Sequence, residues 1–218
     1  STRKESSAAS DVYKRQGVDT MLQLGQVLLA LYITFYLYAF IVYGGMVKFF
    51  GKYSPIQFFK DIAPAGLNAF GTCSSSATIP ISLKCASEKI GIPEEITSLT
   101  LPLGATINMD AVSILMSFMI TFFATALGID LSIGTMVTVL ACNVLLSIGT
   151  PGVPGGAIAA FAALCPIAGI PTNQILGVYI SVNTLCDMGA TCVNVIGDLA
   201  CSTVLKPVSY THLRAHET

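Results

Sequence analysis

The chain of 218 residues is 53% hydrophobic and only 11% charged, with a formal net charge of −1. About a quarter of the residues of a soluble globular domain are charged, so this composition excludes that class and favours a membrane protein. Segments 1–16 and 207–218 are polar and patternless, and we expect both to be non-native. We predict one transmembrane domain over residues 17–206.

Residues 21–47 contain no charged side chain and are rich in Leu, Tyr and Phe. About 20 apolar residues are enough to cross the hydrocarbon core of a bilayer. We therefore predict a transmembrane helix over residues 21–50. Lysines are concentrated after this helix, within residues 55–90 and after a last predicted helix at residues 173–205. The positive-inside rule therefore places those parts of the chain on the cytoplasmic side.

Residues 55–90 contain two short arms around a polar turn at Ser74, Ser75 and Ser76. Neither arm is long or apolar enough to cross a bilayer alone. The pattern predicts a re-entrant helical hairpin, which is tolerated at membrane depth only where it is buried in protein or lines a cavity.

Residues 94–127 are long enough to cross, but Gly104, Asn108 and Asp110 lie in their middle. Asn and Asp are poor residues for a helix interior, so we predict a helix that is broken around residues 106–110. Residues 131–170 hold two prolines and three glycines between positions 150 and 156, which cannot continue a helix. This segment predicts a second re-entrant hairpin.

Residues 173–205 form the last predicted spanning helix. Five polar residues are spaced 4, 4, 3 and 4 apart, which places them on one helical face; they are Asn183, Asp187, Thr191, Asn194 and Asp198. A polar seam that joins two helices is the simpler interpretation of such a stripe. Seams seldom contain two aspartates, so we favour a functional stripe.

An internal repeat relates the two halves of the chain. Asp187 follows Asp110 by 77 residues, and Gly152 follows Ser75 by the same interval. Paired interrupted segments at matching positions point to a midplane transport site between two inverted halves. The predicted fold is thus an all-α membrane protein with two re-entrant hairpins and two interrupted transmembrane helices.

The charge distribution indicates what such a site would carry. No Lys or Arg occurs between Glu95 and Lys206, yet Asp110, Asp187 and Asp198 lie in apolar runs. An ionised carboxylate near the bilayer centre costs on the order of 3 kcal/mol. A cation that binds and is released during a transport cycle would supply the counter-charge. This indicates a transporter and not an enzyme. The seven cysteines are isolated, and we expect no cofactor.

Four ordered motifs resemble the glutamate-transporter family, the dicarboxylate/amino acid:cation symporters. The motifs are Ser74-Ser75-Ser76, the stretch Leu101-Pro102-Leu103-Gly104-Ala105-Thr106-Ile107-Asn108-Met109-Asp110, Ser147-Ile148-Gly149-Thr150 with Gly152-Val153-Pro154-Gly155, and Asp187-Met188-Gly189 with Asn194-Val195-Ile196-Gly197-Asp198. The resemblance implies the transport domain of an elevator-type symporter, in a homotrimer held by a scaffold N-terminal to this segment. It also implies that the chain is a C-terminal fragment, with membrane lipid and a small solute as partners and no nucleic acid.

The resemblance also implies where solutes bind. The implied sodium ligands are Gly104, Asn108, Asn194 and Asp198 in one site, Asn108 and Asp110 in a second, and Thr106, Ser147, Ile148 and Thr150 in a third. The implied substrate contacts are Asp187 at the amino group, Thr191 and Asn194 near the carboxylate, and Ser75, Ser76 and Val153 at the hairpin tips. Oxygen ligands of this kind suit a hard cation such as sodium.

Family members that take acidic substrates carry an arginine four residues before Asn194, where this chain has Ala190. A bidentate guanidinium is the expected partner of a carboxylate. We therefore expect sodium-coupled uptake of a small neutral amino acid such as serine, threonine or alanine, by a multi-pass protein of the bacterial inner membrane.

Three alternatives remain open from the sequence. The first is a proton- or sodium-coupled symporter for glutamate, aspartate or a C4-dicarboxylate. The second is an intramembrane aspartyl protease, because Gly197-Asp198 weakly resembles the motif of such enzymes and two carboxylates can act as acid and base. The third is a remnant that does not transport.

Overall fold

The computed structural model describes residues 22–216, with side chains for residues 22–206. The predicted leader, 1–16, lies outside the described residues, and only the backbone of the tail is described, as far as residue 216. Every regular element within the described range is a helix. Three helical stretches are long and apolar enough to cross a membrane, namely Leu22–Phe49, Glu94–Ala126 and Thr172–Lys206. The prediction of an all-helical membrane protein is confirmed.

The first spanning helix, Leu22–Phe49, is not a plain α-helix. It contains a π-helical segment, η1 (Ala39–Tyr43), which is followed by α2 (Gly44–Phe49). The backbone N–H of Gly44 reaches the carbonyl oxygen of Ala39, five residues earlier. Such π-helical turns are rare and are often found at functional sites, and the sequence did not predict this one.

The chain then folds into a pair of packed helices, α3 (Pro55–Thr72) and α4 (Ser75–Lys84), followed by the π-helical segment η2 (Cys85–Ile90). Ser74 begins α4, because its hydroxyl oxygen accepts a hydrogen bond from the N–H of Ala77 at 3.1 Å. Cys73, with φ of 51°, adopts the left-handed conformation that ends α3 and allows the chain to reverse.

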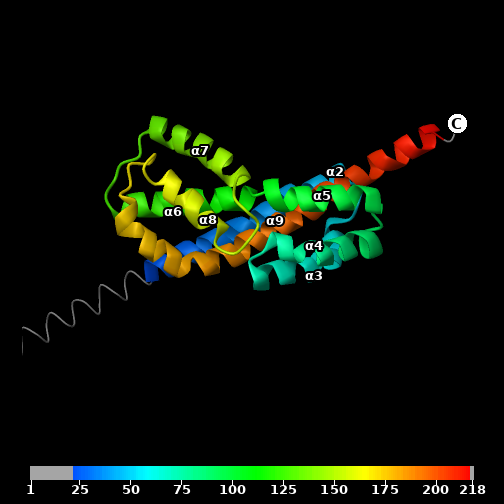
Figure 1. Cartoon of the computed structure of the whole chain (residues 1–218), viewed down its shortest axis with the longest axis horizontal. Coiled ribbons are helices and arrows are strands. Elements are labelled where there is room, and N and C mark those ends of the chain that lie inside the picture. The colour runs from blue at the N-terminus through cyan, green and yellow to red at the C-terminus, as the bar shows by residue number, and fades with distance from the viewer. Residues whose placement is uncertain (1–21, 217–218) are drawn as a thin grey trace, which may run out of the picture.

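The next spanning stretch is divided into α5 (Glu94–Ile107) and α6 (Asp110–Ala126). Only Asn108 and Met109 are non-helical, so the observed break is narrower than the predicted one. A second packed pair follows, α7 (Ile133–Ile148) and α8 (Gly156–Leu164), joined by a non-helical loop over residues 149–155. The two pairs lie in opposite halves of the elongated molecule, with their tips near its middle (Figure 1).

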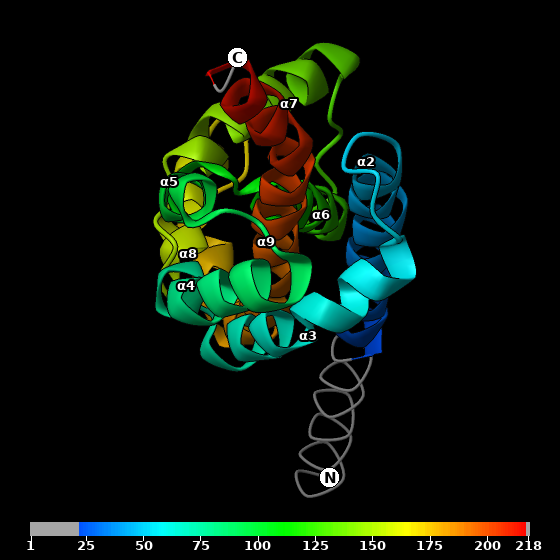
Figure 2. The same cartoon turned by 90° about the vertical axis from the view of Figure 1, so that its right-hand side faces the viewer.

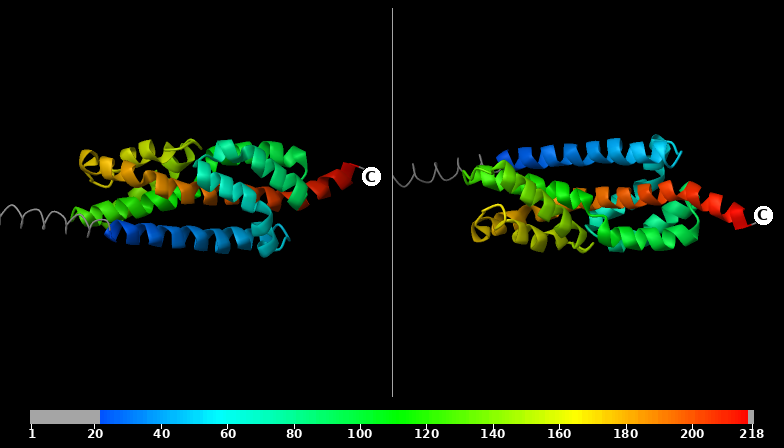
Figure 3. Two further views of the ribbon diagram at one scale, coloured as in Figure 1. Left: turned by 90° about the horizontal axis from the view of Figure 1, so that it is seen from below. Right: turned by 90° about the horizontal axis from the view of Figure 1, so that it is seen from above.

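The last helix, α9 (Thr172–His216), runs through the centre of the bundle and contacts all the other helices of the described residues except α7 (Figure 2). The first spanning helix runs alongside it over most of its length (Figure 3). Residues 189–200 are all buried. A helix that is buried on every side is an internal helix of the fold.

The expectation of two interrupted helices is wrong for the second one. The helix α9 is continuous and extends beyond the predicted end at Leu205. Its glycines occur singly, and one glycine in a helix costs only about 1 kcal/mol. Polar side chains also bond along the helix, since the Thr191 hydroxyl donates to Asp187 one turn earlier and the Ser202 hydroxyl donates to the carbonyl of Asp198. Nothing in this segment therefore forces the helix to unwind.

Candidate functional site

The tips of the two helix pairs meet near the middle of the molecule. The carbonyl oxygen of Gly152, in the loop between α7 and α8, accepts two hydrogen bonds from the start of α4. The donors are the Ser74 hydroxyl at 3.1 Å and the Ser76 N–H at 3.2 Å. Residues that lie 78 and 76 positions apart in the sequence are thereby joined directly.

Asp187 lies on the central helix, directly beneath the α7–α8 loop. Its side chain is buried, and one carboxylate oxygen accepts a hydrogen bond from the N–H of Gly155 at 3.0 Å. The other oxygen accepts a bond from the Thr191 hydroxyl at 3.3 Å. The carboxylate is thus held between its own helix and the loop.

A small cavity of about 10 Å³ lies at this junction. Its lining residues are Cys73, Met109, Val112, Thr150, Pro151, Gly152, Val153, Ala157, Asp187, Thr191 and Asn194. Asp187 is the only acidic member of this lining, and none of its members is basic. A cavity of this size holds at most about one water molecule, so the site is closed in this conformation.

The structure divides the residues that the sequence predicts for substrate binding into three sets. Four of them line the cavity, namely Val153, Asp187, Thr191 and Asn194. Ser75 and Ser76 lie at the contact between the tips, where Ser75 is buried and Ser76 is exposed. Ala190 is fully buried and is not part of the cavity lining.

The break between α5 and α6 is attached to α9 through side-chain amides. The Asn108 amide donates to Asp198 Oδ1 at 2.8 Å and to the carbonyl oxygen of Asn194 at 3.3 Å. In return, the Asn194 side-chain oxygen accepts the N–H of Ala111, at the start of α6, at 3.0 Å. The last of these bonds satisfies a backbone N–H that the start of α6 would otherwise expose.

Gly104 allows Asp198 to approach the backbone of α5. A methyl group on Gly104 would lie 2.7 Å from the carboxyl carbon of Asp198, a distance that requires the side chain to move. Four residues predicted to bind one sodium ion, Gly104, Asn108, Asn194 and Asp198, are therefore brought together. The cluster presents carboxylate, amide and main-chain oxygens, which are the ligands that hard cations prefer.

Asp110 is half-buried at the start of α6 and has partners that the sequence did not predict. The hydroxyls of Tyr38 (at 2.6 Å) and Tyr43 both donate to its Oδ2, while its Oδ1 accepts the N–H of Ala111 at 2.9 Å. The two tyrosines come from the first spanning helix, where Tyr38 precedes the π-helical segment and Tyr43 is its last residue. The signal in the sequence was tyrosine in an otherwise apolar helix, but Tyr32 and Tyr36 lie in the same helix, so this signal does not single out the two donors.

The third predicted sodium set is less compact. Ser147 and Thr150 are buried, whereas Thr106 is exposed and 48% of the Ile148 side chain is exposed. The Thr106 hydroxyl donates to the carbonyl of Leu103 at 2.7 Å. The α7–α8 loop nevertheless reaches the end of α5, because a methyl group on Gly152 would collide with the carbonyl oxygen of Ala105.

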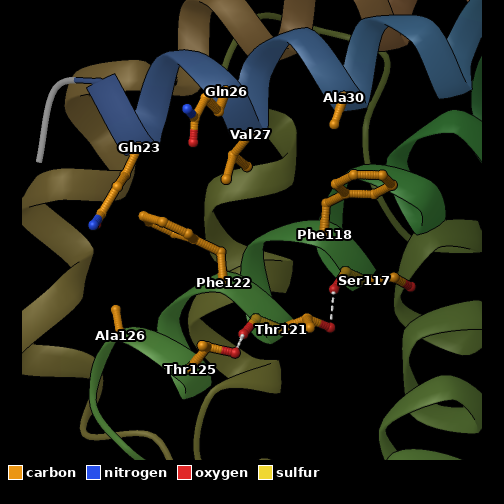
Figure 4. A pocket seen from close by; sticks show the side chains of 10 residues that line it. All are labelled: Gln23, Gln26, Val27, Ala30, Ser117, Phe118, Thr121, Phe122, Thr125 and Ala126. Carbon is orange, nitrogen blue, oxygen red and sulfur yellow. Dashed lines mark hydrogen bonds between the residues drawn. The ribbon is translucent and has the colours of Figure 1, made fainter.

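A larger groove of about 870 Å³ lies elsewhere, between the first spanning helix and α6 (Figure 4). Its lining residues are Gln23, Gln26, Val27, Ala30, Ser117, Phe118, Thr121, Phe122, Thr125 and Ala126. The hydroxyls of Thr121 and Thr125 donate to carbonyls of their own helix at 2.8 Å. The groove contains no charged side chain among these residues and none of the predicted site residues, so we place the functional site at the tips and the helix break.

Comparisons with known proteins identify sequences to which this chain is similar. The sequence model of the sodium:dicarboxylate symporter family matches residues 7–207. An excitatory amino acid transporter of Caenorhabditis elegans is 34% identical over 166 residues, which cover 76% of this chain and 33% of that protein. The neutral amino acid transporter A of Homo sapiens is 34% identical over 163 residues, covering 72% and 30%. Excitatory amino acid transporter 2 of Homo sapiens is 33% identical over 175 residues, covering 78% and 30%. The chain spans about a third of the length of these relatives.

Proposed function

Because the chain belongs to the sodium:dicarboxylate symporter family, we propose that it forms the transport domain of a symporter that couples inward sodium movement to the uptake of a small amino acid. The family resemblance seen in the motifs is confirmed. The observation that carries the proposal is the pair of buried carboxylates, Asp187 and Asp198, in a stretch without Lys or Arg. We propose that a cation neutralises each of them, the substrate ammonium group at Asp187 and sodium at Asp198.

Asp187 is the proposed partner of the substrate amino group, with Thr191 and Asn194 near the substrate carboxylate. A solute ammonium would replace the Gly155 N–H as the partner of Asp187 when the α7–α8 loop withdraws. No basic residue is present in the described cavity lining to bind a second carboxylate. This supports a neutral amino acid over glutamate, aspartate or a C4-dicarboxylate, although the relatives include transporters named for excitatory and for neutral amino acids.

Sodium is the proposed coupling ion. It is proposed to bind at Asp198, at Asp110 and at the third predicted set of ligands, Thr106, Ser147, Ile148 and Thr150. Asn108, Asn194 and backbone carbonyls supply neutral oxygens, which a proton would not need. Each sodium ion that enters down a 100 mV potential contributes about 2.3 kcal/mol, which can drive uptake against a gradient. Coupling to protons is the alternative that the same carboxylates would permit.

The proposal extends to the protein that contains this chain. The two helix pairs are proposed to be re-entrant hairpins that gate the site from opposite sides, in an elevator-type homotrimer assembled through segments N-terminal to this one. The small size of the cavity supports gating, since a solute can enter only if the tips separate. The membrane itself, predicted from the sequence to be a bacterial inner membrane, stays a prediction, and the relatives named above are animal proteins.

The protease hypothesis receives no support from the geometry of the central helix. Asp187 and Asp198 are eleven residues apart on one continuous helix, which separates them by about 16 Å along its axis. A general acid and a general base that share one water must lie within hydrogen-bond reach of it.

Uptake by the full-length protein in proteoliposomes tests the proposal. Labelled serine, aspartate and succinate are offered separately, with an inward gradient of sodium or of choline. We expect serine uptake that requires sodium, and little uptake of succinate. Serine uptake that is unchanged in choline and abolished by a protonophore would show that protons, and not sodium, are the coupling ion. Absence of uptake of any of these solutes would refute the proposal.

Gly104→Ala is expected to raise the sodium concentration for half-maximal uptake about tenfold, which corresponds to about 1.4 kcal/mol. The added methyl group would displace the Asp198 carboxylate. Gly177→Ala on α9 is the matched control, because a methyl group there meets no atom within 4 Å. If the two variants depend on sodium equally, Asp198 is not a ligand of the proposed cation site.

A further inference from the structure

Two tyrosine hydroxyls converge on one carboxylate oxygen. Tyr38 and Tyr43 both donate to Asp110 Oδ2, the Tyr38 bond being 2.6 Å long, and the N–H of Ala111 donates to Oδ1 at 2.9 Å. A carboxylate offers about four lone pairs. Both lone pairs of Oδ2 and one of Oδ1 are therefore engaged, and one direction on Oδ1 remains for a cation to approach.

The π-helical segment makes this convergence geometrically possible. In an α-helix, residues five apart point about 140° away from each other, because each residue turns the helix by about 100°. The wider turn of η1 brings residues that are five apart onto the same side. Tyr38 precedes η1 and Tyr43 ends it, and their rings pack edge to face with centroids 5.3 Å apart. The helical defect thus aims both hydroxyls at Asp110.

Tyr43 also contacts the element that carries Asp198. It is 3% exposed, and a methyl group on Gly197 would collide with its ring and with the Asn108 amide. The ring therefore fills the space that this glycine leaves on α9. The first spanning helix is in this way positioned against both proposed cation-binding carboxylates.

We propose that Tyr38 and Tyr43 are positioning residues that fix the Asp110 carboxylate and thereby set the affinity of the protein for sodium. This inference rests on the proposed function, in which Asp110 is a sodium ligand. Without the two donors the side chain of Asp110 can rotate, and ordering it again opposes cation binding. The tyrosines act through Asp110 and need not touch the ion.

The test measures sodium binding and not uptake alone. The full-length protein is purified as wild type, Tyr38→Phe, Tyr43→Phe and the double variant, and its melting temperature is followed as sodium replaces choline at constant ionic strength. A cation that binds only the native state raises this temperature. We expect the double variant to need about tenfold more sodium for half of the stabilisation, equivalent to about 1.4 kcal/mol. Maximal uptake at saturating sodium should stay close to that of the wild type.

Tyr32→Phe is the matched control. It removes a hydroxyl from the same helix, whose hydrogen bond to the carbonyl of Leu185 on α9 is also 2.6 Å long. This variant should lose stability but keep the sodium concentration for half-maximal stabilisation. If the double variant does not fold, Tyr38→Phe carries the test, because Tyr38 is only partly buried.

An unchanged sodium requirement in the tyrosine variants, or an equal change in Tyr32→Phe, would overturn the inference. Sodium-dependent uptake by the wild type would in that case leave the proposed function intact. A wild-type protein that shows neither stabilisation nor uptake with sodium would overturn both.

Discussion

Asp187→Asn is expected to reduce amino-acid uptake at least about a hundredfold at a substrate concentration below saturation. Asparagine has nearly the same shape and can still accept the N–H of Gly155, so the closed conformation should persist. It carries no charge to pair with a buried ammonium group, and breaking a buried ion pair costs about 3–5 kcal/mol. Initial rates of labelled serine uptake in proteoliposomes, compared at equal protein content, measure the effect.

Asp130→Asn is the appropriate control for this substitution. Asp130 is an exposed carboxylate in the connection between α6 and α7, away from the cavity. Its replacement should leave uptake unchanged. Uptake by Asp187→Asn that equals that of the wild type would show that this carboxylate does not hold the substrate.

Asp198→Asn is expected to raise the sodium requirement for uptake about a hundredfold, because the buried counter-charge of the ion is removed. Asn108 can still donate to the side-chain oxygen at position 198, so the junction between α5, α6 and α9 should stay folded. In sodium-free buffer the variant should melt at a higher temperature than the wild type, since it no longer buries an uncompensated carboxylate. Opposite changes in stability and in sodium affinity distinguish an ion site from a structural hydrogen bond.

Asp61→Asn is the control for this second substitution. Asp61 accepts hydrogen bonds from Tyr53 at 2.7 Å and from Gln57 at 2.9 Å, and it is not part of the proposed site. The sodium requirement should not change in this variant. If Asp198→Asn instead melts at a lower temperature and keeps its sodium requirement, the carboxylate serves the fold and not the ion.

Strong local signals in the sequence predicted several features of the fold. The uncharged run before Lys48 predicted the first spanning helix, and the polar residues Asn108 and Asp110 predicted the break that the structure places at Asn108 and Met109. The serine-rich turn and the Gly/Pro-rich loop predicted where the chain reverses. These features depend on neighbouring residues, so they can be read from a single sequence.

Features that depend on packing could not be read in this way. The second aspartate-bearing helix is continuous, and side chains of its polar stripe bond both within α9 and to the break between α5 and α6; the internal repeat gave no indication of this difference. The burial of Ala190 outside the cavity lining likewise depends on how the helices pack. The tyrosines that bond to Asp110 depend on a π-helical turn, for which no propensity rule is available.

The contact between the tips has a consequence for how a solute would enter. One oxygen atom, the carbonyl of Gly152, accepts bonds from both Ser74 and Ser76. If the α7–α8 loop gates the site as proposed, its withdrawal would free these two donors together, at the positively polarised end of α4. The carboxylate of an incoming solute would then accept them in place of the Gly152 carbonyl. Opening of the tips and capture of the solute would thus exchange one hydrogen-bond acceptor for another.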